Sequence, residues 1–338
     1  MTRHRLVIDA QTLQSRLFGE RGIPRYTTDL CRSLLKAGGP VAAIALNPVL
    51  AHPHRLHHEL ARAPELQWST AAMFERLSRS GPLAYHVMSP FEGPRPVQNT
   101  LPSYALGNGV PLVITVYDLI PEIFKVFPPG STFERVYNMR RDLLRRADLL
   151  VAISQSSAND AMELLDVGPD RVAMIGTGAS EFFRPPLEDE HPETILAEHV
   201  PAINRPFVMG VTGVFGLDTR KNTEALIEAF GRLPEDVRRS HQLVVACRLT
   251  PEAAANWMRL GAEQGLDPDS LVPTGFVLDF VLRALYQRAA LFVYPSLYEG
   301  FGLPALEAAC CGCPTITSNT SSMPEIMEWE PSTFTPTD

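Results

Sequence analysis

The sequence has few cysteines and no long run of apolar residues. Five cysteines in a chain of 338 residues do not indicate a framework of disulfide bonds. Three of them cluster without a second pair of ligands at zinc spacing, so we interpret them as small core residues: Cys310, Cys311 and Cys313. No apolar run is long enough to cross a membrane and no signal-peptide pattern is present, so we expect a cytoplasmic protein.

Positive charge is scarce in the second half of the chain. Residues 1–186 hold 20 Lys and Arg against 17 Asp and Glu, whereas the remaining residues hold 10 against 21, which accounts for the net charge of −8. The first half therefore accommodates an anionic partner better than the second. An acidic chain overall argues against nucleic acid as a partner.

Strand-like apolar segments alternate with helical segments in both halves of the chain. In the first half we expect helices at Ile23–Leu35 and Thr132–Arg146, and strands at Arg5–Ala10, Val41–Leu46, Ala84–Met88, Leu112–Tyr117, Leu149–Ile153 and Val172–Ile175. In the second half we expect helices at Thr223–Phe230, Val281–Gln287 and Pro304–Cys311, and strands at Phe207–Val211, Gln242–Cys247, Ala290–Tyr294 and Pro314–Ser318. Such alternation predicts parallel, doubly wound sheets.

The length of the chain and a proline-rich stretch near Phe183 predict two domains. We expect an N-terminal Rossmann-like domain over residues 1–183, a linker over 184–205 and a C-terminal Rossmann-like domain over 206–338. Ligands of such sheets bind at the carboxyl ends of the strands. The most informative loops of the sequence fall at these ends.

The segment from Glu299 to Glu307 combines two carboxylates, a glycine-rich turn and the start of a helix. Pro304 suits the first turn of a helix, where its missing N–H costs nothing. We therefore expect a strand, a glycine loop and a helix, with free backbone N–H groups at Phe301 to Ala305. These groups form an anion site, and the glutamates beside it suit a ligand with both phosphates and hydroxyls, such as a sugar nucleotide.

The stretch from Tyr294 to Glu307, with Gly312 to Ser318 after it, resembles the signature of family 4 glycosyltransferases and contains that family's paired glutamates. The resemblance implies a retaining enzyme of the GT-B fold, in which two Rossmann-like domains face a cleft. It also implies that the first domain binds the acceptor and the second domain binds the donor. An ordinary strand-to-helix turn with surface glutamates is the alternative interpretation.

A second glycine loop begins at Gly213 and leads to Arg220 and Lys221 before a helix. Cations are disfavoured by the dipole at a helix start, so an anionic ligand explains them better than a solvated basic pair does. The pair resembles the family's basic residues for the donor diphosphate, although Phe215 and Gly216 stand where many members have another arginine. Fixed cations stabilise a departing diphosphate without a metal, and neither glycine loop contains an Asp-x-Asp motif, so we expect no metal and no other cofactor.

The resemblance assigns roles to the residues of the donor site. Arg220 and Lys221 would contact the diphosphate, and Glu307 would contact the ribose hydroxyls. Phe276 and Val277, which come after Thr274 and Gly275, match a loop that often contacts the nucleotide base. Glu299 would hold the sugar together with the backbone of the loop that follows it: Gly300, Phe301, Gly302 and Leu303.

On the acceptor side, Gly22 and Arg25 resemble the family's N-terminal glycine loop, with Pro24 in place of its second glycine. A helix-capping loop with a surface arginine explains this segment equally well. Tyr117 and Asp118 end a central strand and resemble the family's His-Asp-Leu segment, with tyrosine in place of histidine. Asp118 is either an acceptor ligand or a cap for the next turn. The candidate catalytic residues are therefore Asp118, Lys221 and Glu299.

One expected helix, Thr132–Arg146, is rich in arginine. A solvated helix face is the simpler interpretation, and the alternative is a patch that faces an anionic membrane or a lipid-diphosphate acceptor. The arginines concerned are Arg135, Arg140, Arg141, Arg145 and Arg146.

Together these features predict a hexosyltransferase that moves a sugar from a nucleotide-diphosphate sugar to a glycan or lipid-linked acceptor. The resemblance is greatest to bacterial polysaccharide mannosyltransferases, which makes GDP-mannose the first expected donor and UDP-sugars its rivals. We expect the enzyme in the cytoplasm or peripheral to the inner face of the membrane.

A catalytically weak or inactive sugar-nucleotide-binding protein of the same fold is the alternative. Pro24 and Tyr117 depart from the family pattern, and from the resemblance we expect a C-terminal end that is truncated or naturally short. A phosphorylase is disfavoured because it needs a lysine for pyridoxal phosphate, and Lys221 is the only lysine in the second half. Epimerases lack the paired-glutamate segment.

Overall fold

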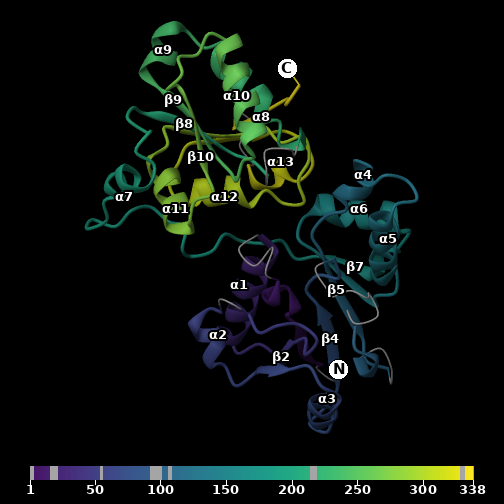
Figure 1. The fold of residues 1–338 in the computed structure, drawn as a ribbon. Helices are drawn as coiled ribbons and strands as arrows, with labels where there is room; N and C mark the ends of the chain where they lie inside the picture. Colours follow the sequence, from purple (N-terminus) through teal and green to yellow (C-terminus); the bar gives the residue numbers. More distant parts are fainter. Residues whose placement is uncertain are drawn as a thin grey trace. The chain divides into compact units, whose positions relative to one another are not determined.

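The computed structural model describes residues 4–15, 22–53, 56–91, 101–105, 109–213, 219–327 and 332–337. The chain divides into two compact units, residues 1–177 and 178–338. Each unit holds one parallel sheet (Figure 1). None of the helices in these described ranges is long and apolar enough to cross a membrane.

The first unit is built on a seven-stranded sheet in the order β3-β2-β1-β4-β5-β6-β7. All neighbouring strands in it are parallel. The strands are β1 (Arg5–Asp9), β2 (Val41–Leu46), β3 (Leu66–Trp68), β4 (Leu83–Val87), β5 (Leu112–Val116), β6 (Leu149–Ala152) and β7 (Val172–Met174). The six expected strands are confirmed, and the short β3 is an addition.

Three helices of the first unit begin where a polar side chain caps them. Ser131, Thr70 and Ser154 each accept a hydrogen bond from the backbone N–H three residues further on, which satisfies a donor that the helix leaves open. The helical segments are η1 (Gln11–Gln14), α1 (Gly22–Lys36), α2 (His58–Arg62), α3 (Ala71–Ser78), η3 (Ser103–Ala105), α4 (Ile120–Ile123), α5 (Thr132–Arg145), α6 (Gln155–Leu165) and η4 (Pro169–Arg171).

The second unit is built on a six-stranded parallel sheet in the order β10-β9-β8-β11-β12-β13. Its strands are β8 (Phe207–Val211), β9 (Gln242–Ala246), β10 (Leu271–Gly275), β11 (Leu291–Tyr294), β12 (Thr315–Ser318) and β13 (Thr333–Phe334). Its helical segments are α7 (Pro192–His199), η5 (Thr219–Lys221), α8 (Thr223–Gly231), α9 (Glu235–Ser240), α10 (Pro251–Glu263), α11 (Asp279–Arg288), α12 (Leu303–Cys310) and α13 (Met323–Ile326).

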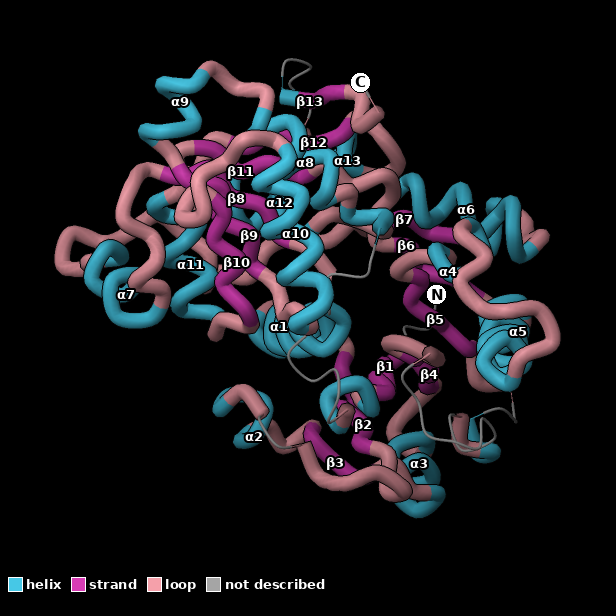
Figure 2. The backbone as a smooth tube through the Cα atoms, turned by 45° about the horizontal axis from the view of Figure 1, so that its top comes forward, coloured by secondary structure: helices cyan, strands magenta, loops and turns pink. Residues whose placement is uncertain are grey.

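Both faces of the second sheet are buried. Successive residues of β9 alternate between two cores: Val244 packs with residues of α7, α11 and α12, whereas Val245 packs with residues of α8 and α10. This is the expected arrangement for a parallel sheet, whose crossover helices cover both faces. Figure 2 shows the strands with helices around them.

Residues 184–205, for which we expect a linker, fall within the second unit. They contain α7, whose Leu196 is buried in the same core as Phe183. Arg184 and Glu190 form two hydrogen bonds of 2.8 Å each, and Gln287 of α11 donates to the Arg184 carbonyl at 2.8 Å. Apolar burial and these hydrogen bonds hold the segment in the second unit. The division between the units lies earlier in the chain, between residues 177 and 178.

Strand order determines where each sheet can open toward a ligand. In the second unit β8 pairs with both β9 and β11, and the chain continues to β10 on one side and to β12 on the other. In the first unit β1 separates β2 and β4 in the same way. Ligands of doubly wound sheets bind where the strand order reverses. In these two sheets that point lies beyond the carboxyl ends of β8 and β1.

Candidate functional site

The glycine loop of the second unit follows β11 at the point where the strand order reverses. Its last residue is Gly302, which has a φ of 106° and stands directly before the first residue of α12. A Cβ atom there would collide with Cε of Met323 and come within 3.0 Å of Cδ1 of Ile326. Only glycine combines this backbone conformation with so little space.

The expected row of backbone donors at the start of α12 is shorter than the sequence indicated. The N–H of Ala305 donates to the Gly302 carbonyl at 3.0 Å, and Pro304 has no N–H. The donors that remain as candidates for an anion are therefore Phe301, Gly302 and Leu303. Ala305 was wrongly included because α12 begins at Leu303, one residue earlier than expected, and its first turn already uses the Ala305 N–H.

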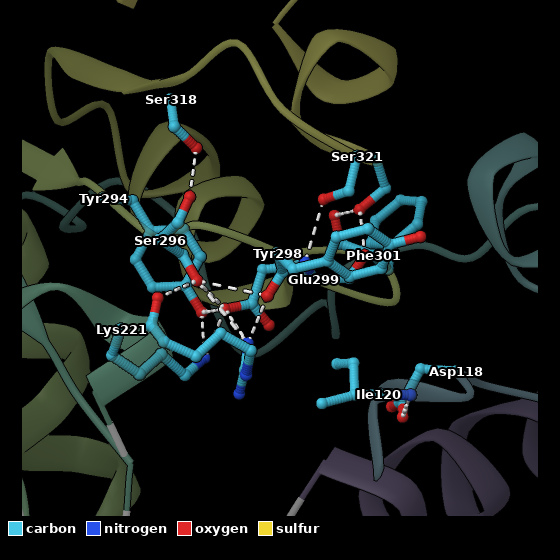
Figure 3. Close-up of polar contacts among 12 residues, drawn as sticks. Asp118, Ile120, Lys221, Tyr294, Ser296, Tyr298, Glu299, Phe301, Ser318 and Ser321 are labelled. Carbon is cyan, nitrogen blue, oxygen red and sulfur yellow. Dashed lines mark hydrogen bonds and ion pairs between the residues drawn. The ribbon is translucent and has the colours of Figure 1, made fainter. Parts of the chain in front are cut away.

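Glu299 is the centre of a buried polar cluster (Figure 3). Its Oε1 atom accepts hydrogen bonds from Arg220 Nη1 and from Lys221 Nζ, each at 2.7 Å. The same oxygen accepts from the Ser296 hydroxyl at 2.5 Å and from the Tyr294 hydroxyl at 3.1 Å. Four donors thus converge on one carboxylate oxygen whose residue is 8% exposed.

The charge of Glu299 partly offsets the charges of Arg220 and Lys221. Burial by itself raises the pKa of Glu299, but the charges of Lys221 and Arg220 and the hydrogen bonds outweigh it, so the pKa lies below its usual value. Burial, and next the Glu299 charge, raise the pKa of Tyr294 well above its usual value. Glu299 is therefore ionised and Tyr294 is neutral at neutral pH, and two cations share one anion.

The cations are held in place from several elements. Arg220 and Lys221 end η5, and Arg220 also donates to the Tyr298 carbonyl. The Arg220 carbonyl accepts from the Leu297 N–H at 2.8 Å. Next to them Asn222 has φ of 54° and caps α8, and its amide donates to the Pro336 carbonyl at 2.9 Å. The basic pair is therefore fixed between the loop after β8 and the loop after β11.

A run of hydroxyl residues after β12 holds the glycine loop. Ser322 donates to the carbonyls of Glu299 and Phe301 at 3.0 and 2.8 Å. Ser321, with φ of 47°, accepts from the Glu299 N–H at 2.8 Å, and Ser318 donates to the Ser296 carbonyl at 2.5 Å. Ser321 and Ser322 are not among the residues predicted from the sequence. The signal that could have found them is their position after β12, the strand that pairs with β11.

The other predicted donor-site residues lie on α12 and in the segments after β8 and β10. Glu307 is in α12 and is 4% exposed. Its Oε2 atom lies 3.5 Å from the hydroxyl oxygen of the buried Tyr286. Val277 packs against the core of the second unit, and the neighbouring Phe276 is 52% exposed with the Arg248 guanidinium over its ring. Gly213 follows β8, and residues 214–218, which include Phe215 and Gly216, lie outside the described residues.

In the first unit the structure brings Tyr117 and Asp118 next to α1 and α4. The Tyr117 ring meets the Tyr26 ring edge-on at 5.5 Å, and Ser157 donates to the Tyr117 carbonyl at 2.6 Å. Asp118 Oδ1 accepts from the Ile120 N–H at 3.1 Å, which places the carboxylate at the turn that starts α4.

The N-terminal glycine segment is described from its second half onward. Gly22 is the first residue of α1, Pro24 is buried in its first turn, and Arg25 follows it. Residues 16–21, which include Gly19, lie outside the described residues. The described part is consistent with helix initiation, since proline is favoured in the first turn.

The arginines of α5 do not form one solvated face. Arg140 is buried and donates to the Phe91 carbonyl, and Arg141 pairs with Glu122 at 2.7 Å. Arg145 donates to the Leu165 carbonyl at 3.1 Å. The expectation of a common basic face is therefore wrong, because helical periodicity turns these side chains toward different neighbours.

Comparison with known proteins agrees with this architecture. The model "Glycosyltransferase Family 4" matches residues 21–180, and the model "Glycosyl transferases group 1" matches residues 211–330. A solved glycosyltransferase from Rickettsia africae superposes with a TM-score of 0.66 at 16% identity, covering 96% of this chain and 82% of its own. WaaG, a glycosyltransferase involved in lipopolysaccharide biosynthesis, superposes with a TM-score of 0.61 at 15% identity, covering 96% and 84%. These are GT-B structures, and the fold of this chain is GT-B.

Curated relatives narrow the class further. The serotype-specific mannosyltransferase WbdA of Escherichia coli is 37% identical over 228 residues, which is 67% of this chain and 27% of the relative. The O-antigen chain mannosyltransferase B of Escherichia coli is 32% identical over 232 residues, which is 67% of this chain and 58% of the relative. This chain thus spans about a quarter of the first relative and more than half of the second. The chain belongs to the family 4 glycosyltransferases.

Proposed function

We propose that this protein is a retaining glycosyltransferase that moves a sugar from a nucleotide-diphosphate sugar to a glycan or lipid-linked acceptor. Mannose is our first choice for the transferred sugar. One observation carries the proposal: Arg220 and Lys221 are both anchored 2.7 Å from Glu299 Oε1, at the point where the second sheet reverses its strand order. Two fixed cations at this point, next to the start of α12, suit a diphosphate.

The chemistry follows from where negative charge develops. Departure of a nucleoside diphosphate concentrates charge on its terminal phosphate, and preorganised donors aimed there lower the barrier by about 3 kcal/mol each. Arg220 and Lys221 bring two positive charges against the single charge of Glu299, so the cluster keeps one net positive charge for the leaving group. These cations and the N–H groups of the glycine loop would provide this stabilisation without a metal ion, which is why we propose a metal-independent reaction.

The remaining donor-site residues are assigned to the sugar and the nucleoside. Glu299 holds the cations through Oε1, so its Oε2 atom is the one we assign to a sugar hydroxyl. Glu307 is assigned to the ribose hydroxyls and Val277 to the base. Asp118 is assigned to the acceptor side, with Gly22, Arg25 and Tyr117.

The names of the relatives support the choice of donor. Two of them are mannosyltransferases, which favours a mannosyl donor, and GDP-mannose is our first choice. A GT-B neighbour from Anabaena was solved in complex with UDP-glucose at 16% identity, so a UDP-sugar is the second choice. We further propose that the protein acts in bacterial polysaccharide synthesis, in the cytoplasm or at the inner face of the membrane.

Nucleotide release from a panel of sugar nucleotides, with and without mannan oligosaccharides as acceptors, tests the proposal. We expect release from GDP-mannose, and we expect Lys221→Ala to reduce it at least 100-fold, because one leaving-group donor is worth about that factor. Arg239→Ala is the matched control, since Arg239 forms an exposed ion pair with Glu235 within α9. Calorimetric binding without turnover would instead favour the non-catalytic alternative, and equal rates in Lys221→Ala and Arg239→Ala would refute the assignment of the site.

A further inference from the structure

The ammonium group of Lys221 is held by two side chains (Figure 3). Its Nζ atom donates to Glu299 Oε1 at 2.7 Å and to the Tyr294 hydroxyl at 2.5 Å. An ammonium group has three N–H donors. Within the described part of the chain these contacts use two of them, which leaves the third for a ligand. Because the bonds of an ammonium group are tetrahedral, two anchored N–H groups fix the direction of the third.

Glu299 by itself is a weak guide for Lys221. The Oε1 atom of Glu299 also accepts from Arg220 Nη1 at 2.7 Å and from the Ser296 hydroxyl at 2.5 Å. A carboxylate oxygen offers about two lone-pair sites, so these donors compete with Lys221 for it. The fixed direction of the Lys221 ammonium group therefore depends on its second anchor, Tyr294.

Tyr294 is itself rigid. It is fully buried on β11, where it pairs with Thr317 of β12, and its ring stacks on Phe292 with the ring centres 5.9 Å apart. Its hydroxyl accepts from Lys221 and donates to Glu299 Oε1 at 3.1 Å. A neutral hydroxyl can do both at once, and a phenylalanine at this position could do neither.

We propose that Tyr294 is a positioning residue that directs the third N–H of Lys221 at the donor diphosphate. The inference rests on the proposed function and adds a residue to it. Tyr294 has no exposed surface with which to contact the substrate, so it acts through Lys221. A preorganised donor contributes most when negative charge develops on the leaving phosphate. We therefore expect kcat, more than the donor KM, to depend on the Tyr294 hydroxyl.

The direct test observes the Lys221 ammonium group in the absence of any donor. The chain has three lysines, and the other two, Lys36 and Lys125, are exposed. NMR of isotope-labelled lysine nitrogens should therefore show one ammonium group whose protons exchange slowly with water, and this signal should be absent from Lys221→Ala. Tyr294→Phe keeps the ring, whose centre lies 4.9 Å from Nζ, and removes only the hydroxyl. We expect it to accelerate the exchange about tenfold, the effect of one lost hydrogen bond to a charged group.

Tyr85→Phe is the matched control. Tyr85 is 1% exposed and donates to Asp9 Oδ2 at 3.0 Å, so this substitution also deletes a buried hydroxyl bonded to a carboxyl group, but in the first unit. We expect the exchange rate of the Lys221 ammonium group to keep its wild-type value in this variant. An exchange rate that is unchanged in Tyr294→Phe, or that changes equally in both variants, would overturn the inference.

Kinetics separates this inference from the proposed function. With nucleotide release from a donor established, Tyr294→Phe should lower kcat about tenfold and change the donor KM by a smaller factor. In a Lys221→Ala background the same substitution should lower kcat no further, because the group that Tyr294 directs is gone.

An equal loss of kcat in both backgrounds would assign Tyr294 a purely structural role and overturn the inference while the proposed function stands. Absence of turnover with any donor would refute the proposed function instead. The exchange measurement would then still decide whether Tyr294 holds Lys221.

Discussion

Lys221 Nζ and Glu299 Oε1 lie 2.7 Å apart, and both side chains are nearly buried, at 13% and 10% exposure. Glu299 contacts Arg220 through the same oxygen at 2.7 Å. One carboxylate therefore keeps two like charges close together in a site with little water. The same arrangement lets the folded chain tolerate these cations and, under the proposed function, orients them toward the diphosphate of the donor.

Replacing Glu299 by glutamine tests this dual role. Glu299→Gln keeps the shape but leaves two cations without their counter-charge, so we expect the free energy of unfolding to fall by about 3 kcal/mol, as for a broken buried ion pair. Urea denaturation measures the change. Glu228→Gln, in an exposed pair with Arg232 on α8, is the control and should cost under about 1 kcal/mol.

The direction of the Glu299 pKa adds a pH dependence to that experiment. Because the folded-state pKa is lowered, the stability that Glu299 contributes is present above its usual pKa near 4.5 and is lost as the pH falls through the folded value. Wild type and Glu299→Gln should therefore converge in stability under acid conditions. A difference that stays constant between neutral and acid pH would contradict the role of the charge.

Gly302→Ala should disrupt the glycine loop. The positive φ costs a side-chain residue about 1 to 2 kcal/mol, and the new Cβ atom meets Met323. We expect loss of transfer activity together with a lower melting temperature in differential scanning calorimetry. Gly261→Ala in α10 is the matched control, because its Cβ atom would find neighbours only at 3.6 Å and beyond, and alanine favours a helix by about 1 kcal/mol. If Gly261→Ala were stabilised while Gly302→Ala kept its transfer activity and melting temperature, the loop would tolerate the new side chain.

Ser322→Ala removes two hydrogen bonds to the carbonyls of Glu299 and Phe301. Because Ser322 is fully buried, the carbonyls lose partners that water does not readily replace, and we expect a loss of about 1 to 3 kcal/mol in the free energy of unfolding. We also expect the KM for the donor to rise, since the loop backbone shifts. Ser240→Ala, whose hydroxyl is exposed at the end of α9, should stay within about 0.5 kcal/mol of wild type. Equal effects of the two substitutions would rule out a special role for Ser322.

Asp9 gives a pH dependence of the opposite sign. Its folded-state pKa of about 7 is above the usual value of 3.8 because of burial, so the folded protein retains a proton that the unfolded chain has released. The corresponding stability is fully present below about pH 4 and is lost as the pH rises through 7. Relative to wild type, Asp9→Asn should gain about 2 to 3 kcal/mol between pH 5 and pH 8.

Chemical denaturation at several pH values measures the Asp9 effect. Asp236→Asn, at an exposed position of α9, is the control and should follow the wild-type curve. Parallel curves for wild type and Asp9→Asn would contradict the raised pKa.

Much of the fold was predictable because local patterns and tertiary burial agree. The strands β2 and β8 have the bounds that their apolar runs predicted, since both are buried. The strand β3 was missed because three residues carry too little pattern. The segment expected to be a linker also contains α7, which its prolines and charges did not predict, because the burial of Leu196 depends on residues far along the chain.

The sequence by itself determined the order of strands and helices, the glycine loop before α12 and the family to which the chain belongs, because each depends on residues close together in the chain. Only the tertiary structure decided that Glu299 binds both Arg220 and Lys221, that Ser322 holds the glycine loop, and that the Tyr85 hydroxyl donates to Asp9. These contacts join residues 21 to 79 positions apart. Parallel strands paired out of chain order bring such residues to one sheet edge, and no local pattern encodes that pairing.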